Sequence, residues 1–203
     1  DATDASALLE GALGLPGALH FALLGLHVAR QALAGIDGDA FYNAVNRVEP
    51  SLIRVEADEL TYDFHIMLRV RLEMALMDGS LRVADLPEAW NAAISEDLGL
   101  TVPDDARGCL QDIHWSTGYL GSFPTYTIGN IMAAQIMDHL RRTQPQVTDA
   151  AQAGDLAPLL GALRNGIWRH GRSRTRNELL QAMTGQTLTV APYLDHLRRR
   201  FAA

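Results

Sequence analysis

Lysine is absent from the sequence, and all 17 positively charged residues are arginine. This absence excludes chemistry that needs a side-chain amine, such as a Schiff-base lysine, a phosphate-loop lysine or a serine–lysine dyad. A base-composition bias in the source would explain it. The acidic residues outnumber the arginines and give a net charge of −7. Because nucleic-acid binding rests on neutralising phosphates, we expect no nucleic-acid partner for so acidic a chain.

Cysteine and uninterrupted apolar runs are also scarce. The single cysteine, Cys109, cannot form an internal disulfide and suits a reducing compartment, so we expect a cytoplasmic protein. The most apolar stretch, residues 7–29, is interrupted by Glu10, Pro16, two histidines and several glycines. These interruptions argue against a membrane span or a signal peptide. We therefore expect a buried, broken helix there and no membrane partner.

Strand patterns are missing as well, whereas alanine and leucine make up over a quarter of the chain. This composition favours helices. Capping residues and apolar spacing predict helices from Asp37 toward Pro50, Asp58–Gly79, Asp85–Gly99, Asp104–Gln111, Ile128–Leu140, Leu156–Trp168, Arg176–Met183 and Ala191–Phe201, with a loop over Trp115–Tyr126. The fold class predicted for residues 1–203 is all-α, in a single domain.

Neither a local zinc motif nor a nucleophilic triad is present. A helical zinc pair needs histidines four residues apart, as in HExxH, but the seven histidines are never closer than seven residues. There is no GxSxG, and Cys109 is expected to be a small packing residue inside a helix.

Two polar segments stand out. The first, Ile53–Tyr62, places Arg54 one turn before the acids that include Asp58. Its arginine could bind a carboxylate bidentately, or the segment could be a helix cap with an ion pair. The second, Gly108–Tyr126, gathers polar and aromatic side chains between glycines: Gln111, Asp112, His114, Trp115, Tyr119 and Tyr126. An Asp–His pair could orient an imidazole for proton transfer or substrate binding. Alternatively, the residues could form a buried polar cluster that only holds a loop in place.

These segments resemble two motifs of the thermostable (Taq-type) zinc metallocarboxypeptidases. IRVEAD at 53–58 matches IRxxAD, GCLQDIHW at 108–115 matches GxxQDxHW, and the similarity covers residues 36–201. The resemblance implies an all-helical, usually dimeric protein that removes C-terminal residues from peptides with a zinc-bound water. By this resemblance Arg54 would help receive the substrate's terminal carboxylate. Asp58, Gln111, Asp112, His114, Trp115 and Tyr126 would line or support that cleft.

The sequence departs from the family at its zinc site. The family holds zinc with the two histidines of HExxH and a later glutamate, whereas this chain has no HExxH. An alignment of Glu10 and Gly14 places Thr3 at the third ligand position, and threonine is a poor zinc ligand. Residues 1–35 are thus expected to be a divergent helical segment, with no bound zinc and no other cofactor.

Three functions remain open at this point. The first is a carboxypeptidase-related protein that lacks peptidase activity alone but retains binding of peptide C-termini. The second is one part of a working metallocarboxypeptidase whose HExxH segment lies upstream or on another chain. The third is a structural or assembly module. Because the missing helices would uncover an apolar face, we also expect a homodimer.

Overall fold

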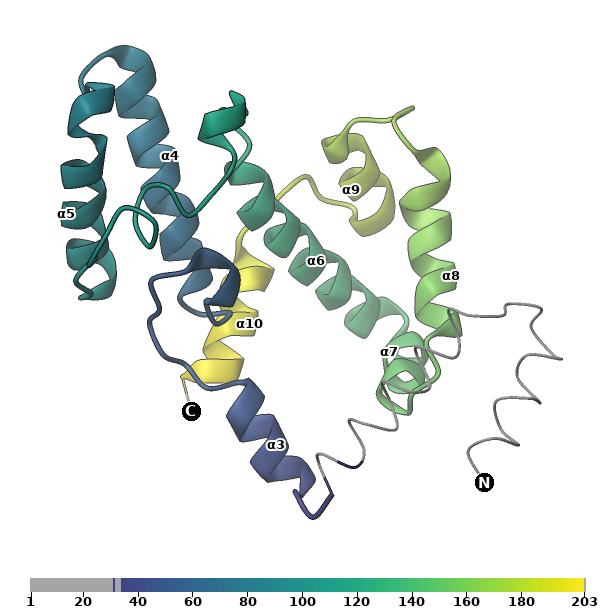
Figure 1. The fold of residues 1–203 in the computed structure, drawn as a ribbon. Coiled ribbons are helices and arrows are strands. Elements are labelled where there is room, and N and C mark those ends of the chain that lie inside the picture. The colour runs from purple at the N-terminus through teal and green to yellow at the C-terminus, as the bar shows by residue number, and fades with distance from the viewer. Residues whose placement is uncertain (1–30, 32–33, 203) are drawn as a thin grey trace, which may run out of the picture. The chain divides into compact units, whose positions relative to one another are not determined.

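Helices account for all the regular structure in the part of the chain that the computed structural model describes, namely residue 31 and residues 34–202 (Figure 1). This confirms the all-α prediction. The α-helices are α3 (Gly38–Val45), α4 (Tyr62–Asp78), α5 (Leu86–Leu98), α6 (Pro124–Thr143), α7 (Pro145–Gln152), α8 (Ala157–Gly166), α9 (Arg176–Thr184) and α10 (Ala191–Phe201). Short 3-10 turns are η1 (Arg54–Glu56), η2 (Val83–Asp85), η3 (Trp115–Thr117) and η4 (Trp168–His170).

The chain divides into two units between Arg47 and Val48. Helix α3 belongs to the first unit, and every later element belongs to the second. The expected N-terminal helical segment, residues 1–35, lies almost entirely outside the described residues. No helix in the described part is long and apolar enough to cross a membrane.

Several helix ends follow from local chemistry, as predicted. Helix α5 carries Pro87 in its first turn and stops at Gly99, whose φ of 69° is a left-handed conformation that glycine adopts without strain. Helix α9 begins at Arg176, where a helix start was predicted; the capping box between Thr175 and Glu178 that starts it was not predicted.

Other boundaries were predicted wrongly. Helix α4 begins at Tyr62 rather than Asp58, because the Asp58 carboxylate accepts hydrogen bonds from the backbone N–H groups of Leu60 and Thr61 and folds this stretch into a turn. The loop expected over Trp115–Tyr126 is shorter, because Pro124 starts α6 and places Tyr126 within the helix.

The helix expected over Asp104–Gln111 is a series of turns. The side-chain amide of Gln111 donates to the carbonyls of Arg107 and Gly108, and its backbone N–H donates to Gly108 three residues back instead of to Arg107, as a helix would require. Cys109 is buried, as expected, although it lies in this turn rather than in a helix. Helix α7 was not predicted. Pro145, which directly follows the end of α6, lies in the first turn of this second helix and begins it.

Helix α4 buries only part of the stripe that its apolar spacing predicts. Leu68 and Leu72 of that stripe are buried, whereas Phe64, Met67 and Met74 are exposed. The buried positions include polar and charged side chains: His65, Arg69 and Glu73 alongside Ile66, Leu68 and Leu72. Helical periodicity failed here because the binding partners of those polar groups lie far away in the sequence.

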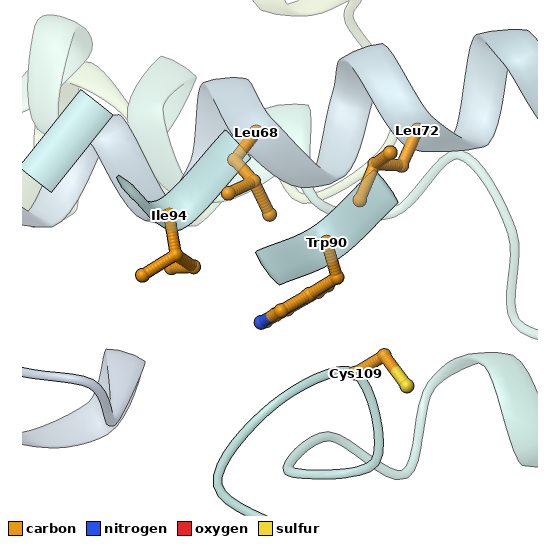
Figure 2. Close-up of a cluster of buried hydrophobic side chains, with 5 residues drawn as sticks. All are labelled: Leu68, Leu72, Trp90, Ile94 and Cys109. Atoms are coloured by element: carbon orange, nitrogen blue, oxygen red, sulfur yellow. The ribbon is translucent and has the colours of Figure 1, made fainter. Parts of the chain in front are cut away.

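Two apolar clusters support the second unit. In one, Leu68 and Leu72 of α4 pack against Trp90 and Ile94 of α5, with Cys109 beneath them (Figure 2). In the other, Ile136 and Leu140 of α6 pack against Leu180 of α9. The first cluster holds α4 and α5 together, and α4 in turn presents its polar residues to the Gly108–Tyr126 segment.

Candidate functional site

The centre of the site is a hydrogen-bonded group of four side chains, Arg54, Arg69, Gln111 and Asp112, which we call the arginine network. Asp112 accepts bonds on one carboxylate oxygen from Nε and Nη2 of Arg54, at 3.1 and 2.7 Å. Its other oxygen accepts from Nε of Arg69 at 2.7 Å. Two arginines from different elements therefore share one carboxylate from a loop, and the two sequence motifs meet at this point.

Gln111 completes the arginine network. Its side-chain carbonyl accepts from the backbone N–H of Arg54 and from Nη2 of Arg69, both at 2.9 Å. Its amide nitrogen donates to the carbonyl of Leu52 at 3.0 Å. Arg69 also donates to the carbonyl of His65 at 2.7 Å. The network thus joins η1, α4 and the turn at residues 108–112. The side chains of Arg54, Arg69 and Asp112 are almost wholly buried, and Gln111 is partly buried.

Burial and charge set the protonation of these groups. Burial disfavours the carboxylate of Asp112, but hydrogen bonds from Arg54 and the charge of Arg69 outweigh it and lower the pKa of Asp112. Burial lowers the pKa of Arg69 to about 10, although Asp112 opposes that shift. Both arginines therefore stay charged at neutral pH. The pKa of His65 falls to about 4 because of burial and the neighbouring charge of Arg69, so this imidazole is neutral.

Trp115 anchors the following loop. Its indole N–H donates to Glu73 of α4 at 2.8 Å, and the other oxygen of Glu73 accepts from the backbone N–H of Gly121 at 3.2 Å. Phe123, fully buried, lies edge-on to Trp115. Glu73 thus binds both ends of the loop from Trp115 to Gly121, which begins directly after His114.

His114 and Tyr126 form the more accessible part of the site. Nε2 of His114 lies 3.1 Å from the hydroxyl of Tyr126. The His114 ring is 4.5 Å from that of Phe123, and the Arg54 guanidinium lies 5.1 Å from the Tyr126 ring centroid. Nδ1 of His114 is 3.9 Å from Asp112, too far for a hydrogen bond. Asp112 therefore orients the arginines, whereas Tyr126 contacts the imidazole.

The seven site residues predicted from the sequence have different partners in the structure. Arg54, Gln111 and Asp112 form the arginine network, Trp115 binds Glu73, and His114 pairs with Tyr126. Asp58 shapes the turn before α4 and accepts from the backbone N–H of Glu49 at 3.0 Å. Those backbone bonds and the hydroxyl of Thr61 outweigh its burial and lower the pKa of Asp58.

Sequence reasoning missed four polar residues that complete the site: Tyr62, His65, Arg69 and Glu73. All four lie on α4. Arg69 and Glu73 stand four residues apart, a spacing that places them on one helix face. The sequence shows this spacing, but the same spacing is found on exposed helix faces whose side chains form salt bridges. Only the bonds to the 108–121 segment distinguish a buried site from such a face.

Metal-ligating side chains do not gather in the described residues. No group of three His, Cys, Asp or Glu residues there could hold a metal ion. The site residues also include two arginines that would repel a cation. This donor set does not suit zinc.

Comparison with known proteins agrees with the two motifs. The profile of the carboxypeptidase Taq (M32) metallopeptidases matches residues 18–201. Thermostable carboxypeptidase 1 of Thermus thermophilus is 40% identical over 172 residues, which are 85% of this chain and 34% of that protein. Carboxypeptidase 1 of Bacillus subtilis is 36% identical over 164 residues, or 81% of this chain and 33% of that protein.

Solved structures give the same result. The M32 carboxypeptidase of Deinococcus radiodurans R1 superposes with a TM-score of 0.80 and 44% identity, over 85% of this chain and 35% of that one. Metallocarboxypeptidase 1 of Trypanosoma cruzi gives a TM-score of 0.78 and 42% identity, over 84% and 36%. The chain therefore spans about a third of the length of the relatives that it matches.

Proposed function

The chain belongs to the carboxypeptidase Taq (M32) metallopeptidase family, and from that premise we propose that it forms the peptide-binding side of such an enzyme. By itself, we propose, it binds peptide C-termini without hydrolysing them. The observation that carries this proposal is the arginine network, in which residues of both motifs are hydrogen-bonded to one another, in a sequence without HExxH. Because its residues do not suit zinc, we assign no hydrolytic step to them.

Within the site, we assign contact with the peptide to Arg54, His114 and Tyr126. Hydrogen bonds use three of the five N–H donors of the Arg54 guanidinium, two to Asp112 and one to Tyr62. The remaining two can receive a terminal carboxylate. His114 and Tyr126 supply a polar pair beside it. Asp58, Gln111, Asp112 and Trp115 hold these groups in position.

A binding experiment tests this assignment. Isothermal titration with N-acetyl-Ala-Phe should show binding, whereas the same dipeptide with a C-terminal amide should bind at least about tenfold more weakly, since charged hydrogen bonds contribute about 1.5–3 kcal/mol. Tyr126→Phe should weaken binding of the acid, because the hydroxyl next to His114 is lost. The matched control is Tyr119→Phe, which alters an exposed phenol. Equal binding of acid and amide would contradict the proposal.

Activity is tested separately. After incubation with zinc and gel filtration, the chain should carry less than stoichiometric metal and should not release phenylalanine from N-acetyl-Ala-Phe. Stoichiometric zinc together with turnover that a chelator abolishes would disprove the claim that the chain alone does not hydrolyse peptides.

A second candidate function is one part of a working carboxypeptidase. Its supporting observation is the exposed apolar stripe of α4, formed by Phe64, Met67, Met74 and Met77. Exposed apolar stripes of this kind mark contact surfaces. Mixing the chain with an M32 polypeptide that carries HExxH should then produce zinc-dependent hydrolysis that neither component shows alone. An inactive mixture would leave only the binding function.

A purely structural role is the third candidate. Under it, Arg54→Ala and His114→Ala would lower the stability of the protein, and no peptide would bind to the unaltered chain in the titration above.

A further inference from the structure

Positive charge is concentrated in the segment that leads into α9. Residues 171–176, with the sequence GRSRTR, contain three arginines and no acidic residue, in a chain whose net charge is −7. Arg172, Arg174 and Arg176 are all exposed, and none of them forms a salt bridge with another described residue. The site described above does not include them, so their charge is free to meet an anion.

These arginines line a groove beside α6, which we call the basic groove and which has a volume of about 640 Å³. Apolar side chains line it as well, namely Ile128 and Met132 of α6 and Leu179 of α9. Glu178 is the only acidic residue in the lining, and its carboxylate accepts hydrogen bonds from the backbone N–H and the hydroxyl of Thr175, at 2.6 and 2.8 Å. The groove therefore carries an excess of positive charge.

The basic groove and the terminal-carboxylate site, formed by Arg54, His114 and Tyr126, lie on two sides of the start of α6. In Figure 1, α6 lies between α4 and α9. The Tyr126 ring lies beside the Arg54 guanidinium, whereas its neighbour Thr125 lines the basic groove. Because a helix with its side chains is about 10–12 Å across and an extended chain advances about 3.3 Å per residue, roughly three or four peptide residues separate the two sites.

An open strip of α6 joins the two sites. The helical period places Gly129 between Thr125 and Tyr126 around the helix axis, and all three residues are exposed. Gly129 has no side chain, and the space where a Cβ would stand is open. An extended peptide that begins at Arg54 therefore has an unobstructed path across α6 to the basic groove.

We propose that the basic groove binds acidic side chains of the peptide, about four residues before the C-terminus that Arg54 receives. This inference rests on the peptide-binding function proposed above, and it names the peptides that the chain prefers, namely those with aspartate or glutamate at that distance. Guanidinium groups pair bidentately with carboxylates. The apolar side chains of the groove contact the methylene groups of the same acidic residues.

Titration calorimetry with three hexapeptides tests the proposal. N-acetyl-Glu-Glu-Ala-Ala-Ala-Phe should bind at least about tenfold more tightly than N-acetyl-Gln-Gln-Ala-Ala-Ala-Phe in 50 mM NaCl, and 500 mM NaCl should remove most of the difference, because salt screens exposed charges. N-acetyl-Ala-Ala-Ala-Glu-Glu-Phe carries the same charge too close to the C-terminus to reach the groove, so it should lose most of this advantage.

Three variants locate the effect. Arg172→Gln/Arg174→Gln should bind the first two peptides equally, with its affinity for the glutamine peptide unchanged. Arg141→Gln/Arg199→Gln, the same loss of charge at exposed arginines outside the groove, should keep the preference for the glutamate peptide. Gly129→Leu places a side chain on the path across α6. It should weaken binding of both peptides but not of N-acetyl-Ala-Phe, which is too short to reach that residue.

The results separate this inference from the function on which it rests. Equal binding of the glutamate and glutamine peptides would overturn the inference, and so would a preference that survives Arg172→Gln/Arg174→Gln or the move of the two glutamates next to phenylalanine. Binding of N-acetyl-Ala-Phe through its carboxylate would be unaffected by those results. If instead the glutamate peptide bound equally well with a C-terminal amide, the terminal-carboxylate function would fail, whereas the basic groove would remain a site for acidic peptides.

Discussion

The arginine network and the apolar cluster of Ile136, Leu140 and Leu180 both join distant segments, but in different ways. In the apolar cluster, α6 and α9 meet through side chains that need only suitable size and shape. In the arginine network, one carboxylate serves two guanidinium groups, so the loss of that carboxylate leaves two buried positive charges without a counter-charge. The apolar cluster contributes stability. The arginine network also fixes the positions of two irregular segments, the one at Arg54 and the one at Asp112, relative to each other. We expect mutations to separate these two contributions.

Removing the shared carboxylate should have the largest effect. Asp112→Asn leaves the two arginines buried without a counter-charge, and should reduce the free energy of unfolding by about 3–5 kcal/mol. Urea denaturation followed by circular dichroism measures the loss. Asp104→Asn, which breaks the exposed pair with Arg107, is the matched control and should change little. A loss equal to that of the control would mean that the network contributes nothing to stability.

Truncation in the apolar cluster should cost slightly less. Leu180 is fully buried, so Leu180→Ala should reduce the free energy of unfolding by about 2–4 kcal/mol through the cavity that it creates. Unlike Asp112→Asn, it should leave peptide binding and the pH dependence of stability unchanged. If peptide binding fell together with stability, the two regions would not be separable.

Lowering the pH should reduce the free energy of unfolding, first through His65 and then through Asp112. The pKa of His65 is about 4 in the folded protein and about 6.5 when unfolded, so the unfolded chain binds a proton first as the pH falls. Stability should therefore drop by roughly 3 kcal/mol between pH 6.5 and pH 4. The lowered pKa of Asp112 stabilises the fold above pH ~4, and that contribution is lost only at lower pH.

Urea midpoints at pH 7.5, 5.5 and 4.5 measure this dependence. His65→Leu should flatten it, because the titrating imidazole is removed. His170→Gln changes a histidine that lies away from the arginine network, and should leave the pH dependence of stability as in the wild type. If His65→Leu leaves the pH dependence of the urea midpoint unchanged, groups other than His65 cause the acid sensitivity.

A single neutral donor should have the smallest effect. Trp115→Phe removes the indole hydrogen bond to Glu73 and should cost about 1–2 kcal/mol, with the fold intact. Trp168→Phe, at an exposed tryptophan, should not alter the free energy of unfolding. Similar losses in both variants would mean that the bond to Glu73 does not anchor the loop.

The sequence predicted much of this, where the signals are local. Pro87 begins α5 and Gly99 ends it because these residues act on their own backbone. The Asp104–Gln111 segment failed because the amide of Gln111 binds the carbonyls that a helix would use. Helix α4 failed for the same kind of reason, since the partners of Arg69 and Glu73 lie more than 40 residues away.

By itself, then, the sequence determined the helical class, most helix ends and the family, because capping groups, helical spacing and motif letters are all local in the chain. It also determined what is lacking: lysine and the HExxH residues. Only the tertiary structure decided which face of α4 is buried and which groups Asp112 binds. The physical reason is that a buried charge is stable only beside its partners, and those partners come together only when distant segments pack.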